Sequence, residues 1–95
     1  MVLNIMVTIV NNDIDEKIKT EMKSVFLKRA SIKKNKLSSD MVLTKVLDAN
    51  PFKLGHILLD LHETFNISPQ YQPLTEFDHF ITVGDIEEYI RAHAS

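Results

Sequence analysis

The sequence has no cysteine, and only two glycines and three prolines occur among its 95 residues. Without cysteine, the chain has no disulfide, no thiolate metal site and no cysteine nucleophile, and a cytoplasmic protein is the simplest expectation. So few turn-forming residues leave little material for a β-rich chain with many tight turns. The composition, 44% hydrophobic and 25% charged, is typical of folded globular proteins. We therefore expect one small all-α domain.

A long hydrophobic run is also missing. The mainly apolar residues 1–10 are too short to span a bilayer, and they lack the basic n-region and the small-residue cleavage site of a signal peptide. We expect residues 1–12 to be an apolar N-terminal extension. It would be a strand-like arm, a helical extension packed on the domain, or partly the result of a start site assigned upstream of Met6. Contact with a membrane is a less favoured alternative.

The net charge is only −2, so neither sign is in large excess, but the charged residues are unevenly distributed along the chain. Residues 1–36 carry eight Lys and Arg against four acids, whereas residues 37–95 carry three against nine. The basic run at residues 28–36 has no interleaved aromatic residues and no recognised binding motif. We expect a solvated loop there. Binding of nucleic acid or of an anionic membrane is the alternative.

A first helix is predicted over residues 13–30. Asp13, with Glu16 three residues later, is typical of a capped helix start with acids at the positive end of the helix dipole. The apolar residues at helical spacing that we expect to be buried are Ile14, Ile18, Met22, Val25 and Phe26. Residues 31–40 then read as a long polar loop, and residues 41–47 as a short helical turn. Their expected apolar anchors are Ile32, Leu37, Leu43, Val46 and Leu47.

A central helix is predicted over residues 50–65. Asn50 is a good N-cap, and Pro51 follows it at a position where a missing backbone N–H costs nothing. The apolar residues spaced three and four apart predict one buried stripe, made of Leu54, Ile57, Leu58, Leu61 and Phe65.

The C-terminal third begins with a loop, because residues 68–73 contain two prolines that exclude a regular helix. A short third helix is expected near residues 74–79, with Phe77 and Phe80 plugging the domain. The last helix is predicted over residues 82–92, with Thr82 as its cap and Asp85 completing a capping box. Its expected core residues are Val83, Ile86, Tyr89 and Ile90, and residues 93–95 form a tail.

Two segments in this order carry a family resemblance. Residues 60–67, Asp-Leu-His-Glu-Thr-Phe-Asn-Ile, and residues 82–85, Thr-Val-Gly-Asp, are placed as in the second and last helices of the acyl carrier protein family, which residues 13–92 resemble. The resemblance implies a four-helix bundle with a long first loop and a short third helix. It also implies a role in fatty-acid, lipid or polyketide biosynthesis.

The chain departs from the family at its defining residue. Family members carry 4′-phosphopantetheine on the serine of an Asp-Ser-Leu triplet at the start of the second helix, and an ungapped alignment through Phe65 places Asn50, Pro51 and Phe52 there. Proline has no hydroxyl, and no serine lies between Ser39 and Ser68. We therefore expect no prosthetic arm and no cofactor.

The resemblance also indicates a partner-binding surface on the central helix, where exposed apolar residues of the family meet partner enzymes. The corresponding residues are Phe52 and Leu59, on a stripe beside the core face, and the neighbouring polar residues are Lys53, His56, Asp60 and Glu63. In the opposing interpretation, Phe52 folds back to cap the bundle and Leu59 only widens the apolar face. Acids of the family's helix are interrupted here by Lys53, Gly55, His56 and His62.

Catalysis and metal binding find little support. His56 and Asp60 lie one helical turn apart with Glu63 nearby, but no His-Glu-x-x-His pattern accompanies them, so a solvated polar face is expected rather than a metal site. The chain offers no plausible nucleophile, no Gly-rich phosphate loop and no paired buried carboxylates. We do not expect an enzyme.

These observations favour a non-enzymatic protein of the acyl carrier type that works through contacts with proteins and without the prosthetic arm. Enzymes of acyl transfer are the candidate partners. Nucleic acid and a membrane span are not expected. Two alternatives remain open. The chain is a genuine carrier with an altered attachment site, or it binds nucleic acid or an anionic membrane through residues 28–36.

Overall fold

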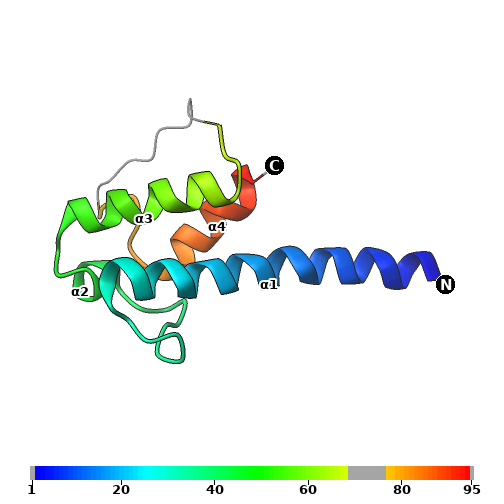
Figure 1. Cartoon of the computed structure of the whole chain (residues 1–95), viewed down its shortest axis with the longest axis horizontal. Coiled ribbons are helices and arrows are strands. Elements are labelled where there is room, and N and C mark those ends of the chain that lie inside the picture. The colour runs from blue at the N-terminus through cyan, green and yellow to red at the C-terminus, as the bar shows by residue number, and fades with distance from the viewer. Residues whose placement is uncertain (1, 69–76, 95) are drawn as a thin grey trace.

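The computed structural model describes the backbone of residues 2–68 and 77–94, and the side chains from Ile14 onward in those ranges. These ranges contain four α-helices: α1 (Val2–Ala30), α2 (Leu43–Val46), α3 (Pro51–Thr64) and α4 (Val83–His93). α3 and α4 lie beside the C-terminal half of α1, as Figure 1 shows. The predicted all-α bundle is confirmed, and the long first loop is present between α1 and α2.

Helix α1 is longer than expected. The prediction that it begins at Asp13 is wrong, because the helix runs without a break from Val2. No proline or glycine lies between residues 2 and 30, so nothing in the backbone stops the helix at the capping signature. The strand-like arm is therefore wrong. The N-terminal part of α1 extends beyond α3 and α4 (Figure 1).

Ile14 is a second correction within α1. Its side chain is 48% exposed, although the sequence pattern predicted a buried residue. The packed part of α1 begins one turn later, at Ile18, which is fully buried. The apolar periodicity of a helix does not show where its neighbours end, so the first residue of the stripe was misassigned. Among the described helices, none combines the length and the hydrophobicity that a membrane-spanning segment requires.

The core is built from the stripes that the sequence predicted on α1, α3 and α4. One contiguous cluster contains Ile18, Met22, Val25, Phe26, Leu43, Leu47, Leu54, Ile57, Leu58, Leu61, Phe65, Ile67, Phe80, Val83, Ile86 and Ile90. The expected loop anchors Ile32 and Leu37 pack against it, as does Phe77. Burial of side chains from all three long helices in one cluster holds the bundle together.

The first loop is fastened to the start of α4 by backbone hydrogen bonds. Leu43 N–H donates to the carbonyl oxygen of Ile81 at 2.8 Å, and Val83 N–H donates to that of Met41 at 3.0 Å. Gly84 N–H donates to the carbonyl oxygen of Ser39 at 2.8 Å, and a Cβ at Gly84 would lie only 3.1 Å from that oxygen. Glycine is therefore favoured at position 84 because the two backbones approach so closely. Thr82 and Asp85 form the predicted capping box.

Helices α1 and α3 end with the same backbone conformation. Ser31 and Asn66 follow these helices with φ of 58° and 53°, in the left-handed region. The next N–H in each case turns back to the helix, from Ile32 to Phe26 O at 3.3 Å and from Ile67 to His62 O at 2.9 Å. The short third helix expected at residues 74–79 is only partly testable. Residues 74–76 lie outside the described residues, and residues 77–79 form a turn.

Candidate functional site

The amino end of α3 is the place where the family resemblance puts a prosthetic group. Asn50 is the N-cap, and its side chain accepts a hydrogen bond from Phe52 N–H at 2.9 Å. Asp48 and Ala49, which precede Asn50, adopt left-handed conformations with φ of 54° and 52°. Pro51 follows as the first residue of α3 and is exposed. The surface at this position therefore presents a pyrrolidine ring and no hydroxyl.

Neither nearby threonine can replace the missing hydroxyl without moving the attachment point. Thr44 lies on α2, before the turn at residues 47–49 that leads to α3. Thr64 is the last residue of α3, roughly 20 Å along the helix axis from Pro51, and its hydroxyl donates to the carbonyl oxygen of Asp60 at 2.9 Å. An arm on Thr64 would start at the opposite end of the helix.

Phe52 and Leu59 project into solvent. Their side chains are 76% and 57% exposed, so Phe52 does not fold back to cap the bundle. They also do not lie beside the core face. Successive helical residues are about 100° apart, which puts Phe52 and Leu59 on the side opposite the fully buried Leu54 and Leu61. The exposed residues His56 and Glu63 share this side. We call Phe52, His56, Leu59 and Glu63 the outer face of α3.

Asp60 lies off the outer face and is already paired. Its carboxylate accepts hydrogen bonds from Arg29 Nε at 2.7 Å and Arg29 Nη2 at 3.0 Å, and Lys28 Nζ is 4.0 Å away. The hydrogen bond from Arg29 lowers the pKa of Asp60 below its usual range. The expected partner-binding Asp60 therefore stabilises the contact between α1 and α3. Lys53 is similarly engaged, with its Nζ 3.5 Å from Asp48 Oδ2.

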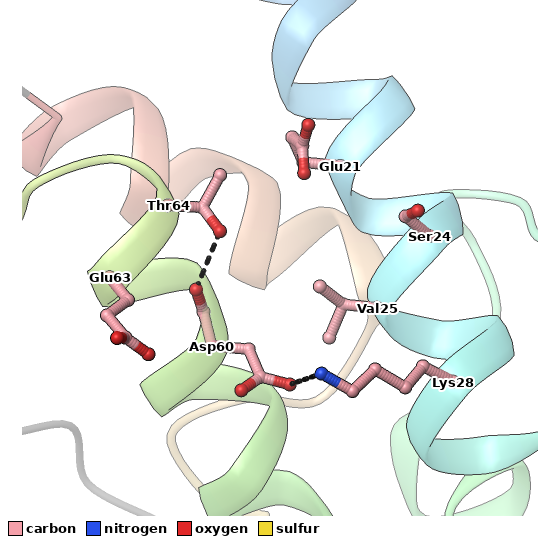
Figure 2. Close-up of a pocket in the computed structure, with 7 residues that line it drawn as sticks. All are labelled: Glu21, Ser24, Val25, Lys28, Asp60, Glu63 and Thr64. Atoms are coloured by element: carbon pink, nitrogen blue, oxygen red, sulfur yellow. Dashed lines mark hydrogen bonds and ion pairs between the residues drawn. The ribbon is translucent and has the colours of Figure 1, made fainter.

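A groove lies between α1 and α3, beside the contact between Lys28 and Asp60. Figure 2 shows its lining, with Glu21, Ser24, Val25 and Lys28 from α1 opposite Asp60, Glu63 and Thr64 from α3. Its volume is about 430 Å³ and it is open to solvent. In the described part of the chain, no three His, Asp or Glu side chains are arranged to hold a metal ion, and His56 and Asp60 form no such site.

His62 was misplaced by the sequence interpretation, which counted it on the surface of the central helix. It is only 7% exposed, and a hydrogen bond of 2.7 Å joins its Nε2 to the hydroxyl of Tyr89 on α4. The two rings stack with centroids 5.6 Å apart. The His93 ring also packs against Tyr89, with the ring centroids 4.6 Å apart, and His93 Nδ1 donates to the Tyr89 carbonyl oxygen at 2.9 Å.

The protonation equilibria of His62 and Tyr89 are shifted. Burial lowers the pKa of His62, and the neighbouring His93 lowers it further. Burial also raises the pKa of the Tyr89 hydroxyl. Because both groups are held neutral near pH 7, the pair joins α3 to α4 without a buried charge. The sequence signal that could have predicted this hydrogen bond is a histidine at the edge of one apolar stripe with a tyrosine on another predicted helix.

Comparison with known proteins gives one informative similarity. No family model matches the chain, and no solved structure matches it. An acyl carrier protein from Lactobacillus johnsonii is 28% identical over 79 residues, which cover 83% of this chain and 95% of that protein. The similarity spans nearly the whole relative and agrees with the helical fold. The chain is related to the acyl carrier proteins.

The basic run is the other departure from a typical acyl carrier protein. Its first two members, Lys28 and Arg29, lie in the last turn of α1 and contact Asp60. The remaining lysines, Lys33, Lys34 and Lys36, are exposed on the loop after α1. This placement fits the expected solvated loop.

Proposed function

We propose that this relative of the acyl carrier proteins is a non-enzymatic, cytoplasmic protein that carries no 4′-phosphopantetheine arm. It acts through protein contacts in fatty-acid, lipid or polyketide biosynthesis. The observation that carries the proposal is Pro51, exposed at the first position of α3, where the family has its modified serine. A phosphodiester to the arm needs a hydroxyl oxygen, and proline has none.

The outer face of α3 supports a role in protein contacts. Phe52 and Leu59 expose large apolar side chains at positions where a monomer gains nothing from them, since they face away from the core. Exposed aromatic and aliphatic side chains on a rigid helix are typical anchors of protein interfaces. We assign Phe52 and Leu59 as the apolar anchors, with His56 and Glu63 at the rim.

Charge supports a partner unlike that of an ordinary carrier. Asp60 is paired with Arg29, and Asp48 with Lys53, so two of the acids near the outer face are already neutralised within the molecule. On the outer face of α3, Glu63 is the one acid that an enzyme specific for acidic carrier helices would contact, where an ordinary carrier has several. We therefore expect such enzymes to bind this surface poorly.

Intact mass tests the missing arm directly. The protein is incubated with a phosphopantetheinyl transferase and coenzyme A, and the Lactobacillus johnsonii acyl carrier protein serves as the control. We expect the control to gain the mass of the arm and this protein to remain unchanged. A mass gain here would favour a genuine carrier with another attachment site, which peptide mapping would locate, with Thr44 and Thr64 as the first candidates.

A competition assay tests the changed surface. An excess of the unmodifiable protein is added while the transferase modifies the control carrier. We expect the rate of modification to stay the same, because the acids that attract such enzymes are missing or paired. Inhibition that Phe52→Ser with Leu59→Ser relieves would show that the ordinary recognition surface has been kept.

A further inference from the structure

The outer face of α3 has a geometry that suits a second copy of itself. Phe52 and Leu59 are seven residues apart, so they lie about 10 Å apart along the helix axis on nearly the same line. When two such helices pack antiparallel, a two-fold axis passes midway between these residues. Phe52 of each copy then lies opposite Leu59 of the other. We infer that the protein self-associates through an antiparallel pair of α3 helices.

The residues at the midpoint fit this arrangement. Gly55 and His56 flank the line from Phe52 to Leu59, one on each side, about 50° from it. A two-fold axis at this point brings Gly55 close to its own copy and His56 close to its own copy. Glycine inside a helix normally costs stability relative to alanine, and close approach of two backbones is one use for it. Isologous pairing of this kind is the commonest way in which protein chains form dimers.

The charges near the face do not oppose the pairing. Asp60 and Lys53 have partners within their own chain, so neither brings an uncompensated charge to the interface. Glu63 lies at the carboxyl end of α3 and would come beside the amino end of the other copy's helix. That end carries the positive pole of the helix dipole, which favours a carboxylate. The outer face is therefore compatible with itself in charge as well as in shape.

The size of the face predicts a weak association. α3 has 14 residues, a length of about 21 Å, and a single helix pair buries much less than the roughly 800 Å² per partner of a standard interface. We expect a dissociation constant on the order of 10⁻⁴ to 10⁻³ M. Self-association covers the anchors assigned above, so it would compete with a partner at high concentration. The inference rests on the exposed face alone and does not require the missing arm.

Disulfide trapping tests the register, because the natural chain has no cysteine that could interfere. His56→Cys should give a disulfide-linked homodimer readily, since the two sulfurs flank the axis. Phe52→Cys mixed with Leu59→Cys should give the mixed dimer in preference to either homodimer. Glu88→Cys, exposed on α4, is the control and should cross-link slowly. Homodimers of Phe52→Cys in preference to the mixed product would overturn the antiparallel register.

Sedimentation equilibrium tests the association itself. The weight-average mass of the natural protein should rise as the concentration increases to about 1 mM, and Phe52→Ser with Leu59→Ser should hold it at the monomer value. Ile81→Ser is the matched control, because Ile81 is 56% exposed but lies outside α3, and it should leave the rise unchanged. A natural protein that stays monomeric throughout, or an equal loss of association with Ile81→Ser, would overturn the inference.

Discussion

Arg29 holds both oxygens of the Asp60 carboxylate, through hydrogen bonds of 2.7 Å and 3.0 Å that join the end of α1 to the middle of α3. The two residues are 31 positions apart in the chain, and nothing in their local sequence pairs them. The pair engages an acid that the sequence placed on the predicted partner-binding surface in a contact within the molecule. It therefore affects both the stability of the bundle and the charge that a partner would meet.

Asp60→Asn should lower the free energy of unfolding by about 0.5–1 kcal/mol, because a two-point but partly exposed ion pair is weakened by solvent and salt. Urea denaturation at pH 7 measures the loss, and Glu88→Gln, on the exposed side of α4, is the control. The folded pKa of Asp60 lies below its ordinary value of 3.8, so its contribution is present above that pH and disappears as the pH falls through the folded value. The difference from the natural protein should therefore shrink as the pH is lowered below 3.8, and a difference that does not depend on pH would contradict the assignment.

Leu61→Ala should destabilise the bundle by about 2–5 kcal/mol, because it leaves a cavity among fully buried side chains. Leu59→Ala removes the same atoms from a side chain that is 57% exposed and should change the free energy of unfolding by less than about 0.5 kcal/mol. Chemical denaturation of the two variants compares the core face and the outer face of one helix. Equal effects would mean that the faces are misassigned.

His62 should make the protein sensitive to mild acid. Its folded pKa lies below the ordinary value of 6.5, so stability is full above pH 6.5 and falls as the pH decreases through the folded value, by at most about 1.4 kcal/mol per pH unit. Thermal unfolding between pH 7.5 and pH 5 should show this loss, and His62→Gln should flatten it. The exposed His56→Gln is the control. If that variant flattens the profile instead, His62 is not the responsible group.

Ser31→Gly should stabilise the protein by about 0.5–1 kcal/mol. Ser31 has a φ of 58° after the last turn of α1, a conformation that costs little for glycine and more for other residues. A higher urea midpoint with an unchanged slope would measure the gain. A lower midpoint would show that the serine side chain contributes more than its backbone conformation costs.

Local sequence signals predicted the elements that depend on local chemistry. Asn50 with Pro51 gave the start of α3, and Thr82 with Asp85 gave the start of α4, because capping is decided within four residues. The same reasoning failed at Asp13, where a capping signature lies inside a helix that continues upstream. A cap can begin a helix, but it does not stop one that has no breaker residue.

Relations between distant residues could not be read in the same way. The Arg29 and Asp60 pair and the His62 and Tyr89 pair depend on which sides of the helices face one another. Periodicity placed Leu54 and Leu61 in the core, but the packing of α4 decided that His62 is buried. The exposed position of Phe52 was one of two open readings, and only the three-dimensional arrangement separates them.

Variants at the start of α3 separate a missing hydroxyl from a changed surface. Pro51→Ser supplies the hydroxyl at a first-turn position that tolerates serine, and Asn50→Asp keeps a good N-cap. Lys53→Asp removes the contact with Asp48 and adds an acid in the first turn, where the helix dipole favours it. We expect Pro51→Ser alone to be modified poorly and the triple variant to be modified efficiently. Equal yields would refute the remodelled surface.

The intact mass of the natural protein after incubation with the transferase and coenzyme A, beside these two variants under identical conditions, shows whether the chain carries the arm. We expect an unchanged mass for the natural protein, a small modified fraction for Pro51→Ser, and a large fraction for the triple variant. Attachment of the arm to the natural chain, with Pro51 in place, would contradict the central claim that this relative of the acyl carrier proteins works without it.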